Sequence, residues 1–241
     1  MATVPQARIG AFSFWQKMAI GLSVFIIFAF AQFGLRGFVD YAHAPLVMHL
    51  HGMAMVAWLG LLTTQSLLAG RGGPGSNGLA LHRRLGWASA VMVPTMVMLA
   101  SALCFTALKL HMFPPFFTPA YFLALVHIEA AFFALLVFMA VSRRSQSDWH
   151  KRLMIGSTVV LMEPALGRLL PMPLIAPWGE WASMVVQLGV VLLIVRHDRR
   201  EIGHTHPATM AVAMVVILGH VMVELLAVTP WWIALTTRLA A

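Results

Sequence analysis

The sequence predicts an all-α polytopic membrane protein with seven transmembrane helices. Of its 241 residues, 60% are hydrophobic and only 10% are charged, and the mean hydropathy is +0.84. Such a composition is typical of membrane proteins, in which a helix needs about 20 apolar residues to cross the hydrocarbon core. The formal charge of +8 therefore indicates basic loops at a membrane surface, and we expect no nucleic-acid partner.

Seven apolar runs of spanning length follow one another, and segments rich in Gly and Pro separate several of them. The runs are 14–34, 45–69, 85–108, 119–141, 151–170, 180–195 and 208–228. The first follows basic residues as a signal peptide does, but its length and the lack of a small-residue cleavage site predict a retained helix. We predict one integral membrane domain over 1–241, with a first helix, a four-helix core at 45–170 and two further helices at 179–228.

The basic residues fall mainly on one side of the predicted membrane. With seven spans, the N-terminal segment and the second, fourth and sixth connections share a side, which then holds twelve of the 16 Lys and Arg residues. They are Arg8, Lys17, Arg71, Arg83, Arg84, Arg143, Arg144, Lys151, Arg152, Arg196, Arg199 and Arg200. The positive-inside rule predicts a multi-pass protein of the bacterial inner membrane, with a cytoplasmic N-terminus and a periplasmic C-terminus.

Short motifs recur in the four-helix core. LHRRL at 81–85 opens the third span and WHKRL at 149–153 opens the fifth, both from the cytoplasmic side. The spans that precede them carry MHLHG at 48–52 and VHIEA at 126–130. The core therefore reads as two parallel helix-pair repeats, related by an axis along the membrane normal.

Four histidines of these motifs pair by depth. His51 and His127 lie on spans that start from the outer side, and the two can share a level. His82 and His150 lie together at the cytoplasmic boundary. Ionisable or coordinating side chains inside a membrane are costly, which makes them candidates for function.

His49 lies two residues before His51, so the two side chains point to different sides of one helix and cannot easily serve one centre. We favour His51 as the ligand because its helix face continues through Met55, Trp58 and Gln65. The choice between the two histidines stays open.

A b-type haem between helices needs imidazoles from facing helices and basic groups for its propionates at the membrane edge. His51 and His127 would hold an outer haem, and His82 and His150 an inner one. The basic residues available to the inner propionates are Arg83, Arg84, Lys151 and Arg152. Because Cys104 is the single cysteine, covalent attachment through a C-x-x-C-H motif is excluded.

The segments HGMAM at 51–55 and LHRRLG at 81–86, followed by single histidines in the next two spans, resemble the cytochrome b-561 family. The resemblance covers residues 45–170. In that family four central helices hold two haems, which implies the pairing of His51 with His127 and of His82 with His150. The expected function is transmembrane electron transfer between a quinol or periplasmic redox partner and an acceptor, as a possible oxidoreductase or a subunit of a larger membrane complex. The fuller pattern is also similar to uncharacterised bacterial polytopic membrane proteins.

Other functions fit parts of the pattern. A copper or iron site, in a metal-handling protein, a membrane enzyme or an oxidase-assembly factor, would draw on imidazole and carboxylate ligands. The candidate ligands are His49, His51, His127, Glu129, Glu163, His220 and Glu224. A proton-coupled transporter would use Glu129, Glu163 and Glu224 as a relay. A retinal protein is excluded, since the seventh span has no lysine for a Schiff base.

Overall fold

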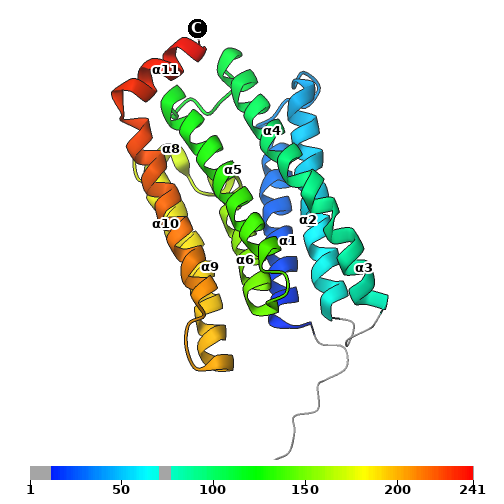
Figure 1. Cartoon of the computed structure of the whole chain (residues 1–241). Coiled ribbons are helices and arrows are strands. Elements are labelled where there is room, and N and C mark those ends of the chain that lie inside the picture. The colour runs from blue at the N-terminus through cyan, green and yellow to red at the C-terminus, as the bar shows by residue number, and fades with distance from the viewer. Residues whose placement is uncertain (1–11, 71–76, 241) are drawn as a thin grey trace, which may run out of the picture.

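The computed structural model describes residues 12–70 and 77–240, and within these ranges every regular element is an α-helix (Figure 1). Arg8 and Arg71 of the charge pattern lie outside the described residues. The helices are α1 (Phe14–Leu35), α2 (Leu46–Gly70), α3 (Asn77–Gly86), α4 (Ala88–Lys109), α5 (Pro119–Ser142), α6 (Ser147–Val160), α7 (Glu163–Leu169), α8 (Met172–Ile175), α9 (Gly179–Ile202), α10 (Pro207–Ala227) and α11 (Pro230–Ala240). The long helices run side by side along one axis.

Six helical stretches in the described part of the chain are long and apolar enough to cross a membrane: α1, α2, α3 with α4, α5, α9 and α10. This confirms the predicted all-α membrane protein. The run predicted at 180–195 is longer in the structure, since α9 extends over 24 residues. The sequence did not predict α11, which follows the last span.

The predicted fifth span at 151–170 is not among these six, because the chain forms two short helices there. Helix α6 ends at Val160, and α7 begins at Glu163. Pro164 accounts for the break, since proline lacks an N–H and its ring clashes with the carbonyl four residues earlier, which is that of Val160. Helix α6 nevertheless lies inside the bundle, where it packs against α1, α5, α9 and α10.

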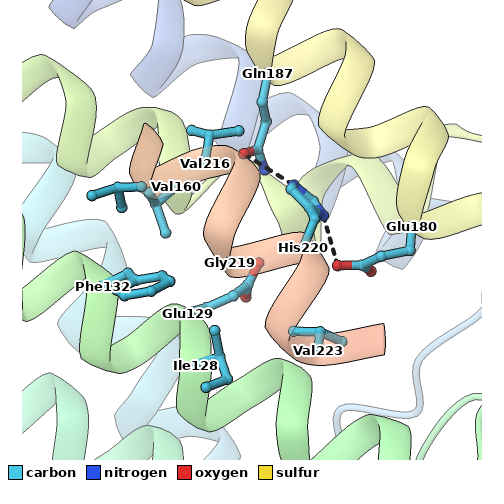
Figure 2. Close-up of a pocket in the computed structure, with 11 residues that line it drawn as sticks. Ile128, Glu129, Phe132, Val160, Glu180, Gln187, Val216, Gly219, His220 and Val223 are labelled. Atoms are coloured by element: carbon cyan, nitrogen blue, oxygen red, sulfur yellow. Dashed lines mark hydrogen bonds and ion pairs between the residues drawn. The ribbon is translucent and has the colours of Figure 1, made fainter. Parts of the chain in front are cut away.

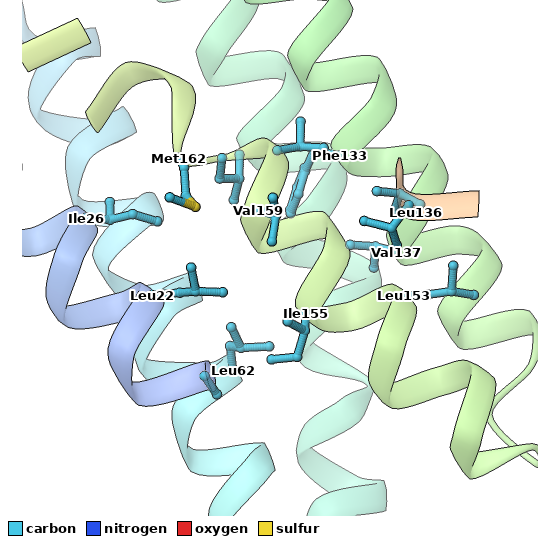
Figure 3. Close-up of a cluster of buried hydrophobic side chains, with 14 of the residues drawn as sticks. Leu22, Ile26, Leu62, Phe133, Leu136, Val137, Leu153, Ile155, Val159 and Met162 are labelled. Carbon is cyan, nitrogen blue, oxygen red and sulfur yellow. The ribbon is translucent and has the colours of Figure 1, made fainter. Parts of the chain in front are cut away.

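The core is an apolar cluster at the centre of the bundle (Figure 3). Leu22 from α1, Leu62 from α2, Phe133 from α5 and Val159 from α6 all belong to it. In an apolar surround, helices are held together by close packing rather than by the hydrophobic effect. Gly156 allows α6 to pack closely against α10, because a Cβ at this position would collide with the side chain of Val212.

A buried ion pair joins α6, α9 and the start of α10 near the basic end of the bundle. Arg152 Nη2 lies 2.6 Å from Asp198 Oδ1, and the two residues are only 2% and 0% exposed. The second oxygen of Asp198 accepts hydrogen bonds from Thr209 Oγ1 at 2.6 Å and from the backbone N–H of His206 at 3.1 Å. Both charges are thus compensated without solvent.

We expect Arg152→Ala to destabilise the protein by about 3–5 kcal/mol, because it leaves the Asp198 carboxylate buried without its partner. The measurement is SDS-induced unfolding in mixed micelles, followed by tryptophan fluorescence. Lys151→Ala is the matched control, since Lys151 pairs at 2.6 Å with the exposed Asp148 and such a pair contributes about 0–1 kcal/mol. Equal losses for the two variants would contradict the prediction.

Candidate functional site

Two histidines from different helices meet at the basic end of the bundle. The ring centroids of His82 on α3 and His150 on α6 lie 6.2 Å apart, with the ring planes at 82° to each other. The sequence predicted that these two residues share a level. The structure brings their side chains together across the bundle.

Backbone carbonyls fix the orientation of both rings. Nδ1 of His82 donates to the carbonyl of Gln65 at 3.1 Å, and Nδ1 of His150 donates to the carbonyl of Ala140 at 2.9 Å. A carbonyl oxygen can only accept, so the proton of each neutral ring lies on Nδ1 and the lone pair on Nε2. Metal-ligating histidines are oriented in this way by carbonyl or carboxylate partners.

The two imidazoles are close enough that both would be able to hold one bound metal centre. Their ring centres lie 6.2 Å apart, and the proton on Nδ1 leaves Nε2 as the donor atom of each ring. Such a pair would suit a b-type haem, which imidazoles from facing helices hold and which would supply one-electron redox chemistry.

The four basic residues predicted for haem propionates differ in their surroundings. Arg152 is committed to the buried pair with Asp198, and Lys151 pairs with Asp148. Arg83 and Arg84 lie in the last turn of α3 and are exposed. Of the four, these two are the ones best placed to take up an added anionic group beside His82.

The outer histidines lie at one level on parallel helices, although their rings make no contact within the described residues. Trp58 of α2 packs edge-on against Phe133 of α5 at 5.1 Å. His51 lies seven residues before Trp58 and His127 six before Phe133, so they stand about 10 and 9 Å beyond that contact.

The two outer rings differ in their hydrogen bonds. His127 repeats the pattern of the inner pair, since Nδ1 donates to the Leu123 carbonyl at 2.9 Å and Nε2 accepts from the Ser101 hydroxyl at 3.0 Å. Nδ1 of His51 is buried and has no hydrogen-bond partner. A buried polar atom without a partner costs free energy, which marks His51 as a ligand candidate.

The residues of the predicted metal site are divided among several places. His49 is exposed and lines an open groove of about 510 Å³ together with Met48 and Met53. Within the described ranges, no group of three or more His, Cys, Asp or Glu side chains is arranged to hold a metal ion. The seven residues that the sequence predicts as metal ligands therefore do not come together as one metal centre in the described structure.

A second buried polar cluster lies between α5, α7, α9 and α10 (Figure 2). His220 Nδ1 lies 2.6 Å from Glu180 Oε1, and His220 Nε2 lies 3.4 Å from Gln187 Oε1. Gln187 Nε2 in turn donates to Glu163 Oε2 at 3.5 Å, and the Tyr121 hydroxyl donates to Glu180. We call these five residues the Glu180–His220 network.

A small cavity adjoins this network. Its volume is about 20 Å³, and its lining includes Glu129, Glu180, Gln187 and His220 among apolar side chains. A cavity needs about 10–15 Å³ to hold a water molecule, so this one has room for a single water and none for a macrocycle. The side chain of Glu129 enters it from α5 (Figure 2).

The remaining charged candidates lie near this network or apart from it. Glu224 is half-buried one turn beyond His220 on α10. Arg168, which follows Glu163 on α7, points elsewhere: its guanidinium donates to the Pro164 carbonyl at 2.6 Å and lies 3.9 Å from the ring centre of Phe30.

Sequence reasoning missed Tyr121, Glu180 and Gln187. Glu180 is the first residue of the shortest apolar run, and a carboxylate at that position is easily assigned to the loop that precedes the helix. Gln187 lies seven residues later, two turns along the same helix face. That spacing was the available signal, because two polar side chains on one face of an apolar helix point to a partner inside the bundle.

No family model, curated protein or solved structure matches this chain.

We expect Glu180 and His220 to be energetically coupled, because each is almost wholly buried and the two atoms that join them are 2.6 Å apart. A double-mutant cycle with Glu180→Gln and His220→Ala, measured by SDS-induced unfolding, should give a coupling free energy of about 1–3 kcal/mol. The matched cycle pairs His220→Ala with Glu201→Gln, an exposed glutamate on the same helix α9. Additivity in both cycles would contradict the prediction.

Proposed function

We propose that this chain is a membrane electron-transfer protein that binds b-type haem between its helices. The observation that supports this most is the His82 and His150 pair, whose ring centres lie 6.2 Å apart and whose Nδ1 atoms are anchored on carbonyls. Haem supplies one-electron redox chemistry when bound. The chain supplies two oriented imidazoles, and the exposed Arg83 and Arg84 are available to the propionates.

A second haem between His51 and His127 is part of the proposal. Support comes from their equal level on α2 and α5, the carbonyl-anchored ring of His127 and the unpartnered Nδ1 of His51. Two such centres near opposite faces would let electrons cross the bundle. This arrangement is the one implied by the resemblance to the cytochrome b-561 family.

We further propose that α6 and α7 together make a seventh crossing, as part of two helix-pair repeats. The burial of α6 between α1, α5, α9 and α10 supports this. Seven crossings and the distribution of the basic residues favour the bacterial inner membrane, with the N-terminus in the cytoplasm and the C-terminus in the periplasm. A quinol or a periplasmic redox protein would then be the partner at the outer face.

We expect the detergent-purified protein to give the reduced visible spectrum of a b-type haem and a positive pyridine haemochrome assay. His82→Ala and His150→Ala should each remove the same haem, because one axial ligand of a pair does not hold it alone. His204→Ala, at an exposed histidine, should leave the haem content unchanged. A colourless protein with a normal elution profile and helical content would overturn the proposal.

His51→Ala and His49→Ala separate the two candidates for the outer ligand. We expect His51→Ala to lower the haem content of the outer site, because His51 Nδ1 lies buried in the bundle whereas His49 is exposed in the groove. His49→Ala should keep both haems. The measurement is haem per chain, with copper and iron determined on the same samples. Loss of copper with His49→Ala, and no haem in the wild type, would favour the metal-handling function instead.

A further inference from the structure

The two helices that carry the inner histidines are held in different ways. Helix α3, which carries His82, lies wholly within the described residues and has no buried residue. Helix α6, which carries His150, buries eight of its residues. Helices in an apolar surround are held by close packing, so side-chain packing fixes α6 far better than α3. The position of His82 must therefore depend on other contacts.

Gln65 on α2 supplies two such contacts to His82. Its side-chain Nε2 donates to the backbone carbonyl of His82 at 3.0 Å, and its own backbone carbonyl accepts from His82 Nδ1 at 3.1 Å. A carbonyl oxygen has two lone pairs, so that of His82 can accept this donor although it lies inside a helix. Helices α2 and α3 pack side by side (Figure 1). The backbone and the ring of His82 are thus tied to one residue, and we call these two hydrogen bonds the Gln65–His82 clasp.

Stability alone does not explain an amide at position 65. Gln65 Oε1 is buried and has no hydrogen-bond partner among the described residues, which costs free energy. Methionine, an apolar side chain of similar length, would remove this cost and lose only one neutral hydrogen bond, so the two changes offset each other in part. What glutamine adds over methionine is an N–H group that reaches the His82 carbonyl.

We propose that Gln65 is a positioning residue for the inner haem ligand, and that its side chain sets the place and orientation of the His82 imidazole relative to that of His150. This rests on the proposed function and adds to it the residue that orients one ligand. The two ring planes lie at 82° to each other, and the electronic state of a ferric haem depends on the angle between its axial imidazoles. Groups that orient a ligating histidine typically change metal affinity or activity by about 10–100-fold.

The first test measures the clasp without reference to haem. Hydrogen–deuterium exchange of the full chain in detergent, followed by mass spectrometry over residues 77–86, should be severalfold faster in Gln65→Met than in the wild type. The backbone carbonyl of residue 65 remains in this variant, so the experiment isolates the side-chain bond. Wild-type exchange in Gln65→Met would overturn the proposal, whether or not haem is bound.

Gln16→Met is the matched control. Gln16 Nε2 donates to the backbone carbonyl of Ser66, the residue after Gln65, and the other hydrogen bonds of Gln16 join it to Ser13 at the start of α1. The variant therefore removes a bond of the same kind at the same level of α2, together with the cap of α1. Exchange over residues 77–86 should stay unchanged, and an increase equal to that of Gln65→Met would overturn a specific role for Gln65.

The second test reads the haem. The EPR signal of the inner ferric haem is the one that His82→Ala abolishes, and Gln65→Met should shift its low-field line. The same variant should lose this haem to apomyoglobin severalfold faster than the wild type, whereas Gln16→Met should change neither property. An unmoved line with a lowered unfolding midpoint would show a structural role only and overturn the proposal. A wild type without haem would overturn the proposed function itself, and the exchange data would still decide whether Gln65 positions His82.

A second variant covers a failure to fold. If Gln65→Met does not fold, Gln65→Asn decides, because its amide is one methylene shorter and falls short of the His82 carbonyl. It should reproduce the faster exchange over residues 77–86 and the shifted EPR line. Wild-type exchange in Gln65→Asn would overturn the proposal.

Discussion

The constraint on which this structure depends is that polar side chains between apolar helices must be satisfied by other helices. No water surrounds the bundle core to solvate a stray charge or donor. Arg152 therefore reaches Asp198 on another helix, and His220 reaches Glu180. These contacts fix which helices neighbour each other and at what level, so the polar groups specify an arrangement that apolar packing alone leaves loose.

The two polar sites differ in the side chains that they bring together. At the basic end, imidazoles held by carbonyls offer lone pairs, which suits metal ligation and electron transfer. Between α5, α9 and α10, Glu129, Glu180, Gln187 and His220 line a small cavity with room for one water. The two sites lie on different helices, but α6, which carries His150, packs against α5, α9 and α10, which carry most of the Glu180–His220 network.

Much of the helical framework could be predicted from the sequence, because long apolar runs leave few alternatives in a membrane. The meeting of His82 and His150 followed from their place at the start of similar motifs. The break between α6 and α7 was harder, since Pro164 acts on the Val160 carbonyl and membrane helices often tolerate proline. The partner of His220 could not be found by spacing, since Glu180 lies 40 residues away on a separate helix. Likewise, Arg152 looked like a surface cation until the structure put Asp198 against it.

The composition of α6 bears on how the chain is made. The helix has 14 residues, and its first two turns carry Asp148, His150, Lys151 and Arg152. A segment this short and charged is a poor substrate for independent insertion by the translocon. His150 and Arg152 find their partners on α5 and α9, so these polar groups become tolerable only once those two helices are in place. We therefore expect α6 to enter the membrane together with its neighbours, so that biosynthesis of this region is a cooperative event rather than a series of single helices.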